Sequence, residues 1–275
     1  QPEAPVDTSE MLAPDLRGYG FSDAPKAVDA YRQDKLVADV MGILDAFGAE
    51  RAVVIGHDWG CALAWQVARS EPGRVRAVAG LSVPYPGLGP KAPTEQMRAA
   101  FGERFFYQLY FQQPDVPEQE LEADVRDFLR RMYHALSGPG MQEKFRAEKP
   151  VTGLLDILQP PTGGQPDWMR ESDLDVYVER FEHSGLTGPI NWYRAMDASW
   201  RQQKEDGRER IHPPALFIAG KEDPVIQFAG KALERMPTMM DDLREVVLLD
   251  DLGHWIQMEA PEAVNQHLGA FLDSL

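Results

Sequence analysis

The sequence predicts an α/β protein with one mostly parallel β-sheet, flanked by helices and interrupted by a long helical insertion. Short apolar runs typical of buried strands alternate with segments of helical apolar spacing, over residues 11–89 and again over residues 211–275. Residues 90–210 carry helical and loop patterns without a convincing strand. Because alternation of strand, helix and strand implies parallel pairing with right-handed crossovers, both ends of the chain should build one sheet. We therefore divide the chain into core residues 1–89, an insertion at 90–210 and core residues 211–275.

The first core part contains two predicted strands and two predicted helices. Residues Ala30 to Phe47 carry apolar side chains at helical spacing and predict a helix. The β-branched run from Arg51 to Gly56 predicts a buried strand, and Cys61 to Arg69, rich in Ala and Leu, predicts the helix that follows. A second apolar strand is expected from Val75 to Val83, where prolines stop it.

The insertion and the second core part differ in pattern. A Pro- and Gly-rich loop at residues 159–166 interrupts the insertion. After the insertion, strands are expected at Pro214 to Gly220 and at Arg244 to Leu249, with a helix around Lys231 to Met236 between them. A last helix should run from Pro261 to Leu275, since proline is favoured in a first helical turn. The insertion is also rich in aromatic residues: Phe101, Phe105, Phe106, Tyr107, Tyr110, Phe111, Tyr133, Trp168, Tyr177, Trp192, Tyr193 and Trp200.

The composition is that of a globular protein and argues against several partners. Of the 275 residues, 44 are acidic and 28 basic, and the net charge of −16 repels nucleic acid and anionic membrane surfaces. No run approaches the roughly 20 apolar residues of a membrane span, and the polar residues 1–10 do not resemble a secretory signal. The single Cys61 cannot form an internal disulfide, which fits a reducing, cytoplasmic location. The absence of an initiator Met suggests a trimmed or partial chain.

The sequence Gly56-His57-Asp58-Trp59-Gly60 stands where the first predicted strand meets the following helix. This is the setting of a nucleophile elbow, Gly-x-nucleophile-x-Gly, in which the nucleophile occupies a sharp, strained turn. We expect that a Cβ at either flanking glycine would crowd the turn. The nucleophile here would be Asp58. A Gly-rich turn in which Asp58 only bonds to the backbone would give the same local pattern, and the motif alone leaves both interpretations open.

An aspartate at this position favours a particular mechanism. With an ordinary pKa of ~3.9, Asp58 is an anion at neutral pH and needs no base before it attacks. It can displace a leaving group at a saturated carbon and form an ester with the substrate. A base is required only afterwards, to activate the water that attacks the ester carbonyl. An esterase is disfavoured, because an Asp nucleophile would form an anhydride with an acyl substrate.

The base and the acid that orients it are expected in the order nucleophile, acid, histidine. Asp223 follows the first predicted strand of the second core part, and His254 lies in a Gly-containing loop after the last predicted strand. Glu222, Asp250 and Asp251 lie close in sequence and remain alternatives for the acid. Three residues at matching positions and in this order predict a catalytic triad.

With their neighbours, these residues resemble the epoxide hydrolases of the α/β-hydrolase fold, over nearly the whole chain from Met11 to Leu275. The resemblance implies a covalent nucleophile at Asp58, a base at His254 supported by Asp223, and a helical cap at residues 90–210. It rests on five segments that are weak singly and specific together: Ala13-Pro14-Asp15-Leu16-Arg17-Gly18-Tyr19-Gly20, Gly56-His57-Asp58-Trp59-Gly60, Tyr107-Gln108-Leu109-Tyr110-Phe111-Gln112, Gly188-Pro189-Ile190-Asn191-Trp192-Tyr193-Arg194 and Gly253-His254-Trp255.

The resemblance also implies two cap tyrosines, Tyr107 and Tyr193, that hold the epoxide oxygen. Ring opening places negative charge on that oxygen, and a phenol with a pKa of about 10 can donate a hydrogen bond or a proton to it. Tyr110, by contrast, is interpreted as a packing residue. Trp59, whose backbone N–H could serve an oxyanion hole, and Trp192 are expected to contact the substrate.

The partners implied are a small epoxide and water. The aromatic cap favours an apolar or aromatic epoxide. We expect neither a metal nor an organic cofactor, because the histidines are scattered and no Gly-x-Gly-x-x-Gly loop is present. Two alternatives stay open. A dehalogenase of the same fold also uses an Asp nucleophile, although a departing halide needs no proton from tyrosines. A non-catalytic protein could use the cap as a ligand pocket.

The resemblance further predicts a His-Gly-x-Pro segment ahead of the first matching motif, with a second donor for the oxyanion hole. The sequence instead passes from ten mostly polar residues to Met11-Leu12-Ala13-Pro14-Asp15, which resembles a strand of the family. The chain could be a fragment, join segments across a gap, or be naturally shortened. In a naturally shortened chain, the lost donor would slow ester hydrolysis by ~10²–10³. An exposed sheet edge could then favour a homo-oligomer.

Overall fold

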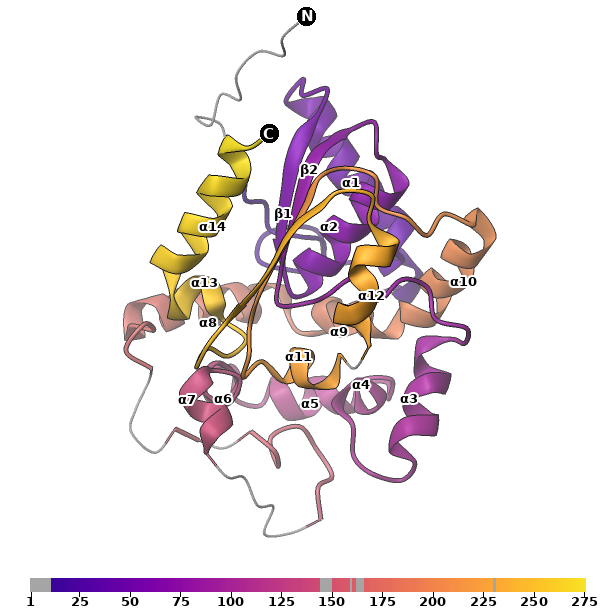
Figure 1. Ribbon diagram of the computed structural model, residues 1–275. Helices are drawn as coiled ribbons and strands as arrows, with labels where there is room; N and C mark the ends of the chain where they lie inside the picture. The colour runs from indigo at the N-terminus through magenta and orange to yellow at the C-terminus, as the bar shows by residue number, and fades with distance from the viewer. Residues whose placement is uncertain (1–10, 144–149, 159, 162–165, 230) are drawn as a thin grey trace, which may run out of the picture.

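Four parallel strands form one sheet in the order β1-β2-β3-β4 (Figure 1). β1 spans Ala52–His57, β2 Val75–Leu81, β3 Ala215–Gly220 and β4 Leu243–Leu249. Each end of the chain contributes two strands, as the sequence predicts. The computed structural model describes residues 11–143, 150–158, 160–161, 166–229 and 231–275. The interpretation of residues 1–10 and much of the predicted loop at 159–166 fall outside these ranges.

The helices of the first core part begin at residues other than those predicted. The helix expected from Ala30 begins at Gln33 as α1 (Gln33–Ala46), because η1 (Val28–Tyr31) is a separate 3-10 turn. Arg32 between them is extended, with φ −62° and ψ 146°. α2 (Trp59–Ser70) begins directly after Asp58 rather than at Cys61. The candidate nucleophile therefore stands between β1 and α2 with no loop on either side.

Helices cover both faces of the sheet and bury its apolar side chains. On one face, Trp65 of α2 packs in a cluster with Phe217 of β3. On the other face, α14 (Pro261–Asp273) contributes Phe271 to a cluster with Ile218. Phe217 and Ile218 are neighbours in β3 and serve opposite faces, as the alternation of side chains along a strand requires. All of β3 is buried, the pattern expected of a parallel strand with neighbours on both sides.

Between β2 and β3 the described residues form eight helices and no strand, in agreement with the predicted helical insertion. Figure 1 shows α4 to α8 gathered at one end of the sheet. These helices enclose an apolar cluster of their own around Phe128, Leu129 and Leu174. The division at residues 90 and 210 remains our interpretation. The helices are α3 (Pro93–Phe101), α4 (Tyr107–Tyr110), α5 (Val116–Leu121), α6 (Val125–Ala135), α7 (Gly138–Gln142), α8 (Glu171–Ser184), α9 (Thr187–Arg194) and α10 (Met196–Asp206).

Three short helices complete the second core part. α11 (Pro224–Phe228) and α12 (Ala232–Met239) connect β3 to β4, and α13 (Ile256–Glu259) precedes α14. Among the described residues, no helix combines the length and apolar character that crossing a membrane requires.

Residues 11–15, which resemble a strand of the family, form no strand in this structure. Met11 is 91% exposed and Leu12 is 48% exposed. A strand needs a neighbour for its backbone hydrogen bonds, and within the described ranges β1 pairs only with β2. The segment therefore has no strand beside it with which to pair.

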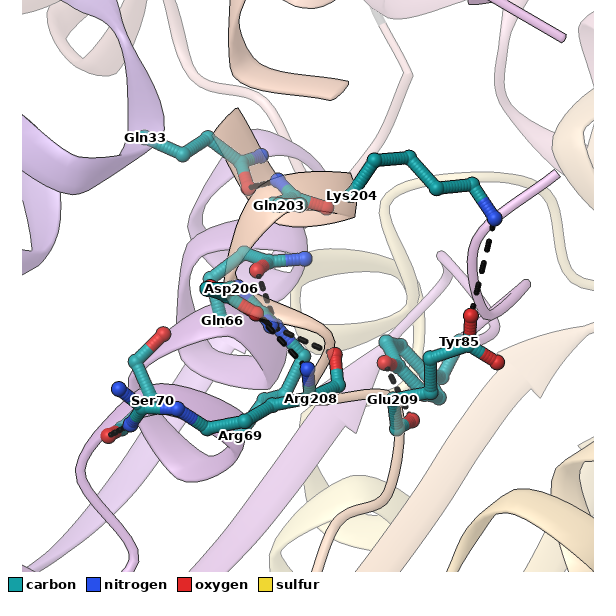
Figure 2. A network of polar contacts seen from close by, with 10 residues as sticks. All are labelled: Gln33, Gln66, Arg69, Ser70, Tyr85, Gln203, Lys204, Asp206, Arg208 and Glu209. Carbon is teal, nitrogen blue, oxygen red and sulfur yellow. Dashed lines mark hydrogen bonds and ion pairs between the residues drawn. The ribbon is translucent and has the colours of Figure 1, made fainter. Parts of the chain in front are cut away.

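The return of the chain from the insertion to the sheet is anchored by Arg69, near the end of α2 (Figure 2). Its guanidinium donates to both carboxylate oxygens of Asp206 at 2.7 and 3.0 Å, and to the Arg208 carbonyl at 2.7 Å. Arg69 is only 2% exposed, so this is a buried ion pair. Nearby, the Gln203 amide donates to the Gln33 side chain at 2.7 Å. These contacts fix α10 against α1 and α2.

Candidate active site

Asp58 occupies a strained turn between β1 and α2. Its backbone has φ +50° and ψ −118°, a region that residues other than glycine rarely adopt. A Cβ on Gly56 would lie 2.1 Å from the Gly60 carbonyl oxygen, whereas a Cβ on Gly60 would meet nothing within 4 Å. The prediction that both flanking positions are crowded is therefore confirmed at Gly56 and wrong at Gly60, where the added atom would face open space. The turn leaves the Asp58 side chain 38% exposed.

His254 lies between two carboxylates. Its Nδ1 donates to Asp223 Oδ2 at 2.9 Å, and its Nε2 lies 3.4 Å from Asp58 Oδ1. Asp223 is fully buried and His254 is 3% exposed, so solvent does not compete for the bond between them. Asp250, an alternative acid, pairs with Lys221 instead. The structure thus brings together the three residues predicted for the triad, with one imidazole nitrogen fixed and the other facing Asp58.

The backbone of His254 is held from three directions. Its N–H donates to the Leu136 carbonyl in the insertion at 2.7 Å. Its carbonyl accepts 2.8 Å hydrogen bonds from His57 Nε2 and from the Ser82 hydroxyl. Because a carbonyl can only accept, His57 carries its proton on Nε2. Burial first, and then the charge of His254, lower the pKa of His57 to about 4, so His57 is a neutral support at pH 7.

The charges at the site are coupled. Burial lowers the pKa of His254, but its hydrogen bonds to Asp223 and Asp58 and the charges of these carboxylates outweigh burial and raise it to about 10. Burial likewise opposes ionisation of Asp58, yet the hydrogen bond and charge of His254 hold the pKa of Asp58 below its ordinary value. At neutral pH, His254 is therefore an imidazolium between two carboxylates.

The raised pKa of His254 predicts a pH dependence of stability. Its ordinary pKa is 6.5, so between pH 6.5 and about 10 the folded protein holds a proton that the unfolded chain has lost. The stabilisation from His254 is complete below pH 6.5 and is lost as the pH rises towards 10. We expect the free energy of unfolding of the wild type, minus that of His254→Gln, to shrink between about pH 6.5 and about pH 9 in urea titrations. A constant or growing difference would contradict the charged imidazolium.

Tyr107 on α4 and Tyr193 on α9 face each other near Asp58. Their ring centroids are 5.8 Å apart at an interplanar angle of 77°. Burial raises the pKa of Tyr107 to about 12, and Gln108 Nε2, which donates to its hydroxyl at 2.8 Å, acts in the opposite direction. Burial also raises the pKa of Tyr193 well above 10, and the charge of Asp58 adds to the rise in both tyrosines. Both phenols are therefore protonated at neutral pH and available as donors.

Known proteins share both the sequence and this fold. Residues 7–261 match the family described as alpha/beta hydrolase fold. The chain is 42% identical over 268 residues to epoxide hydrolase A of Mycobacterium tuberculosis, covering 96% of this chain and 82% of that protein. It is 36% identical over 298 residues to epoxide hydrolase B of the same organism, covering 96% and 84%. The crystal structure of epoxide hydrolase A from Mycobacterium thermoresistibile superposes with a TM-score of 0.86 at 43% identity, over 95% of this chain and 81% of that one. The chain belongs to the epoxide hydrolase family.

Family membership confirms the resemblance and the fold drawn from the sequence. Among the relatives described above, none is a dehalogenase, so that alternative has no support beyond the shared nucleophile type. Tyr110, interpreted as a packing residue, is buried and donates to Glu120 Oε2 at 2.9 Å, away from the other two tyrosines.

The two tryptophans predicted to contact substrate lie at different depths in this epoxide hydrolase. The Trp59 ring stands edge-on to Tyr193, with centroids 4.8 Å apart, and the Trp59 backbone N–H is among the groups that hold the pKa of Asp58 below its ordinary value. Trp192 is 2% exposed, and its indole N–H donates to the Arg17 carbonyl at 3.0 Å. Trp192 therefore supports Trp59 from behind, with ring centroids 5.6 Å apart. A direct substrate contact by Trp192 stays a prediction.

Two aromatic residues near the site were not singled out from the sequence. Trp255 packs against His254, His57 and Tyr133, and its buried indole N–H has no protein partner. Tyr19 is close enough to Asp58 that, after burial, the charge of Asp58 raises its pKa further. Both residues lie inside segments that resemble the family, and this was the only indication in the sequence that they lie near the site. Their side-chain directions could not be inferred from it.

No other feature of the described residues competes as a reaction centre. A hollow of about 910 Å³ opens between residues 15–25 and α1, and Trp192 is the one candidate residue that borders it. Within the described ranges, no group of three or more His, Cys, Asp or Glu side chains is placed to hold a metal ion. The candidate catalytic groups therefore remain Asp58, Asp223, His254 and the two tyrosines.

Proposed function

We propose that the chain converts apolar or aromatic epoxides to vicinal diols through a covalent ester at Asp58. The observation that carries the proposal is the position of His254, which contacts Asp58 through Nε2 and the buried Asp223 through Nδ1. A base held in this way can act on a water only at the carboxyl group of Asp58. That arrangement suits a two-step reaction at one residue.

In the first step, a carboxylate oxygen of Asp58 attacks one ring carbon of the epoxide. A carbon–oxygen ester bond forms, the ring carbon–oxygen bond breaks, and its electron pair goes to the former ring oxygen. That oxygen takes a proton from Tyr107 or Tyr193. Burial raises the pKa of Tyr107 to about 12 and the pKa of Tyr193 well above 10, so neither loses its proton before the substrate arrives. Each hydroxyl aimed at the developing oxyanion contributes about 3 kcal/mol to the transition state.

In the second step, His254 takes a proton from a water, and the hydroxide formed attacks the carbonyl carbon of the ester. The tetrahedral intermediate collapses by breaking the bond between that carbon and the alkoxy oxygen, which takes the proton from the His254 imidazolium and leaves as the diol. The carboxylic acid formed on Asp58 then ionises, and its proton returns to the tyrosinate left by the first step. The Trp59 backbone N–H, which is among the groups that hold the pKa of Asp58 low in the free protein, stabilises the oxyanion in this step. Asp223 holds the imidazolium that forms.

The aromatic side chains near Asp58 support the proposed substrate class. Trp59, Tyr107, Tyr193 and Trp255 present aromatic surface around Asp58, and such surface gains free energy from contact with apolar or aromatic groups. Water is the second substrate. A styrene-type epoxide, with one aromatic substituent, is therefore a suitable first probe.

The test is a single turnover of styrene oxide with excess protein in water enriched in ¹⁸O, with intact-mass measurement of the protein. Attack by Asp58 predicts a transient adduct of the epoxide's mass, a diol without ¹⁸O and one ¹⁸O atom retained in the protein. Asp58→Asn should show neither the adduct nor the diol within the same time. Direct attack of water would instead put ¹⁸O into the diol and overturn the ester. A protein that binds the epoxide but never turns it over would favour the non-catalytic alternative.

A further inference from the structure

Tyr107 is carried by a helix too short to be stable by itself. α4 spans only the four residues Tyr107–Tyr110. An isolated turn of helix is unstable in water, and the carbonyls at its end lack intrahelical partners. The position of the Tyr107 hydroxyl must therefore be fixed by contacts from outside α4. Gln108 holds the hydroxyl itself but belongs to the same turn.

Arg194, the residue directly after Tyr193, contacts the chain at the C-terminal end of α4. Its Nε donates to the carbonyl of Phe111, the C-cap residue of α4, at 2.9 Å. Its Nη2 donates to the Gln113 carbonyl two residues later, at 2.6 Å. A cation at the C-terminal end of a helix satisfies free carbonyls and opposes the partial negative charge there. Arg194, the last residue of α9, thus connects that helix to the end of α4.

Arg194 is itself held rigidly. Both of its terminal nitrogens donate to the carboxylate of Glu118 on α5, with Nη2 at 3.0 Å from Oε2. The two side chains are only 11% and 8% exposed, so the pair is largely withdrawn from water. A paired guanidinium presents its five N–H donors in a fixed plane, which a lysine ammonium cannot reproduce.

A second side chain repeats the link. Gln112 Nε2 donates to the carbonyl of Gln108 at 3.0 Å and to the carbonyl of Tyr193 at 3.1 Å. One amide therefore bridges the backbone beside Tyr107 to the backbone of Tyr193. Gln112 and Arg194 join the two tyrosine-bearing helices, and the acceptors that make this link are the backbone carbonyls of Gln108, Phe111, Gln113 and Tyr193.

We propose that Arg194, fixed by Glu118, is a positioning residue that sets the Tyr107 hydroxyl relative to the Tyr193 hydroxyl, so that both address one epoxide oxygen. This inference rests on the proposed function and extends it to a residue that touches neither the substrate nor Asp58. The alternative is that the buried pair only stabilises the cap. The two differ because the tyrosines act in alkylation, whereas His254 and Asp223 act in hydrolysis of the ester.

The experiment measures the two steps separately in Arg194→Lys and Glu118→Gln, using the full chain and styrene oxide. Alkylation is followed by intact mass on mixing with excess epoxide. Hydrolysis is followed as loss of the adduct after rapid removal of free epoxide. Displacement of a reacting group by about 1 Å can cost 10²-fold, so we expect alkylation by Arg194→Lys to slow about 10- to 100-fold. Hydrolysis should stay within about 3-fold of the wild-type rate, because the triad does not contact Arg194.

Arg69→Lys is the matched control. Arg69 is also a buried arginine that binds one carboxylate with both terminal nitrogens and one backbone carbonyl. It lies about 15 Å along α2 from Trp59, the residue after the nucleophile, given a rise of 1.5 Å per residue. We expect this variant to lose stability as Arg194→Lys does, with both rate constants unchanged.

The outcomes separate this inference from the function on which it rests. Selective slowing of alkylation in both site variants, with Arg69→Lys normal, would support the positioning role. Equal slowing of both steps, or alkylation at the wild-type rate, would overturn it. Should Arg194→Lys fail to fold, Glu118→Gln, which keeps a neutral acceptor for the guanidinium, decides alone. A wild-type protein that is never alkylated would overturn the proposed function, and this inference with it.

Discussion

His254→Gln is expected to leave a protein that is alkylated once and then stops. Without a base, water attacks the ester slowly, and removing a general base typically lowers the rate of its step by about 10²–10⁴. Alkylation needs no base, because Asp58 is already ionised and its pKa is held below the ordinary value in part by His254. We expect intact-mass spectra to show the adduct on nearly every molecule after addition of excess styrene oxide, with almost no diol formed.

The control for this prediction is His134→Gln. His134 is another buried histidine, and its Nε2 lies 3.3 Å from a carboxylate oxygen of Glu143. It contacts neither Asp58 nor Asp223 in the described structure, so its replacement should leave multiple turnover intact. A His254→Gln protein that makes diol at the wild-type rate would remove His254 from the mechanism. One that is never alkylated would mean that His254 is needed to form the ester as well.

His254 is protonated in the free protein, yet hydrolysis of the ester needs it as a neutral base. The charges of the neighbouring carboxylates explain how both conditions can be met. The pKa of about 10 depends on the hydrogen bonds and charges of Asp223 and of Asp58. In the proposed mechanism, Asp58 is neutral once it becomes an ester, and its part in raising the pKa of His254 is lost. The pKa of His254 must therefore fall in the alkylated protein, which releases the imidazole as a base at the point where hydrolysis requires it. Alkylation itself thus prepares the second step.

The sequence predicted the elements that depend on local pattern. The run of β-branched residues before Gly56 and the helix after it place Asp58 at a strand–helix junction, because strand and helix periodicities differ. Asp223 and His254 were assigned from their positions after two later strands. In a parallel sheet the carboxyl ends of all strands lie at one edge, so residues that follow different strands meet there. This topological reason explains why a triad spread over nearly two hundred residues could be assembled without coordinates.

Local pattern and strand order could not predict the contacts between separate elements. Nothing in the residues around Leu136 indicates that its carbonyl accepts from the His254 N–H. The bridge from Arg194 to Glu118 likewise joins helices whose packing is set by the whole cap. At Gly60 the motif itself misled. The motif predicts that only glycine fits at this position, but a Cβ added there would meet open space. Side-chain direction and interhelical packing are tertiary properties, and local spacing does not encode them.

Tyr107→Phe and Tyr193→Phe are each expected to slow alkylation of Asp58 by about 10²–10³, because each removes one donor to the developing oxyanion. The measurement is the rate of adduct formation at saturating epoxide. Hydrolysis of a preformed adduct should change little, because neither hydroxyl contacts His254 or Asp223 in the described structure. Tyr110→Phe is the matched control, since its hydroxyl binds Glu120 and should not affect either step. Equal losses in Tyr110→Phe would mean that the rate follows cap stability rather than hydrogen bonding to the substrate.

The double variant tests whether the two hydroxyls act on one atom. If both hydroxyls bind the same oxygen, removal of one changes what the other contributes. The effects of the two single variants on the free energy of activation then do not add up to the effect of the double variant. If they act on different atoms, the losses multiply, to about 10⁴–10⁶ in total. A haloalkane probe adds a chemical control, since a departing halide requires no proton. Alkylation of Asp58 by a haloalkane, however slow in the wild type, should then be unchanged in both tyrosine variants. Loss of that reaction as well would show that the tyrosines shape the pocket rather than donate to an oxygen.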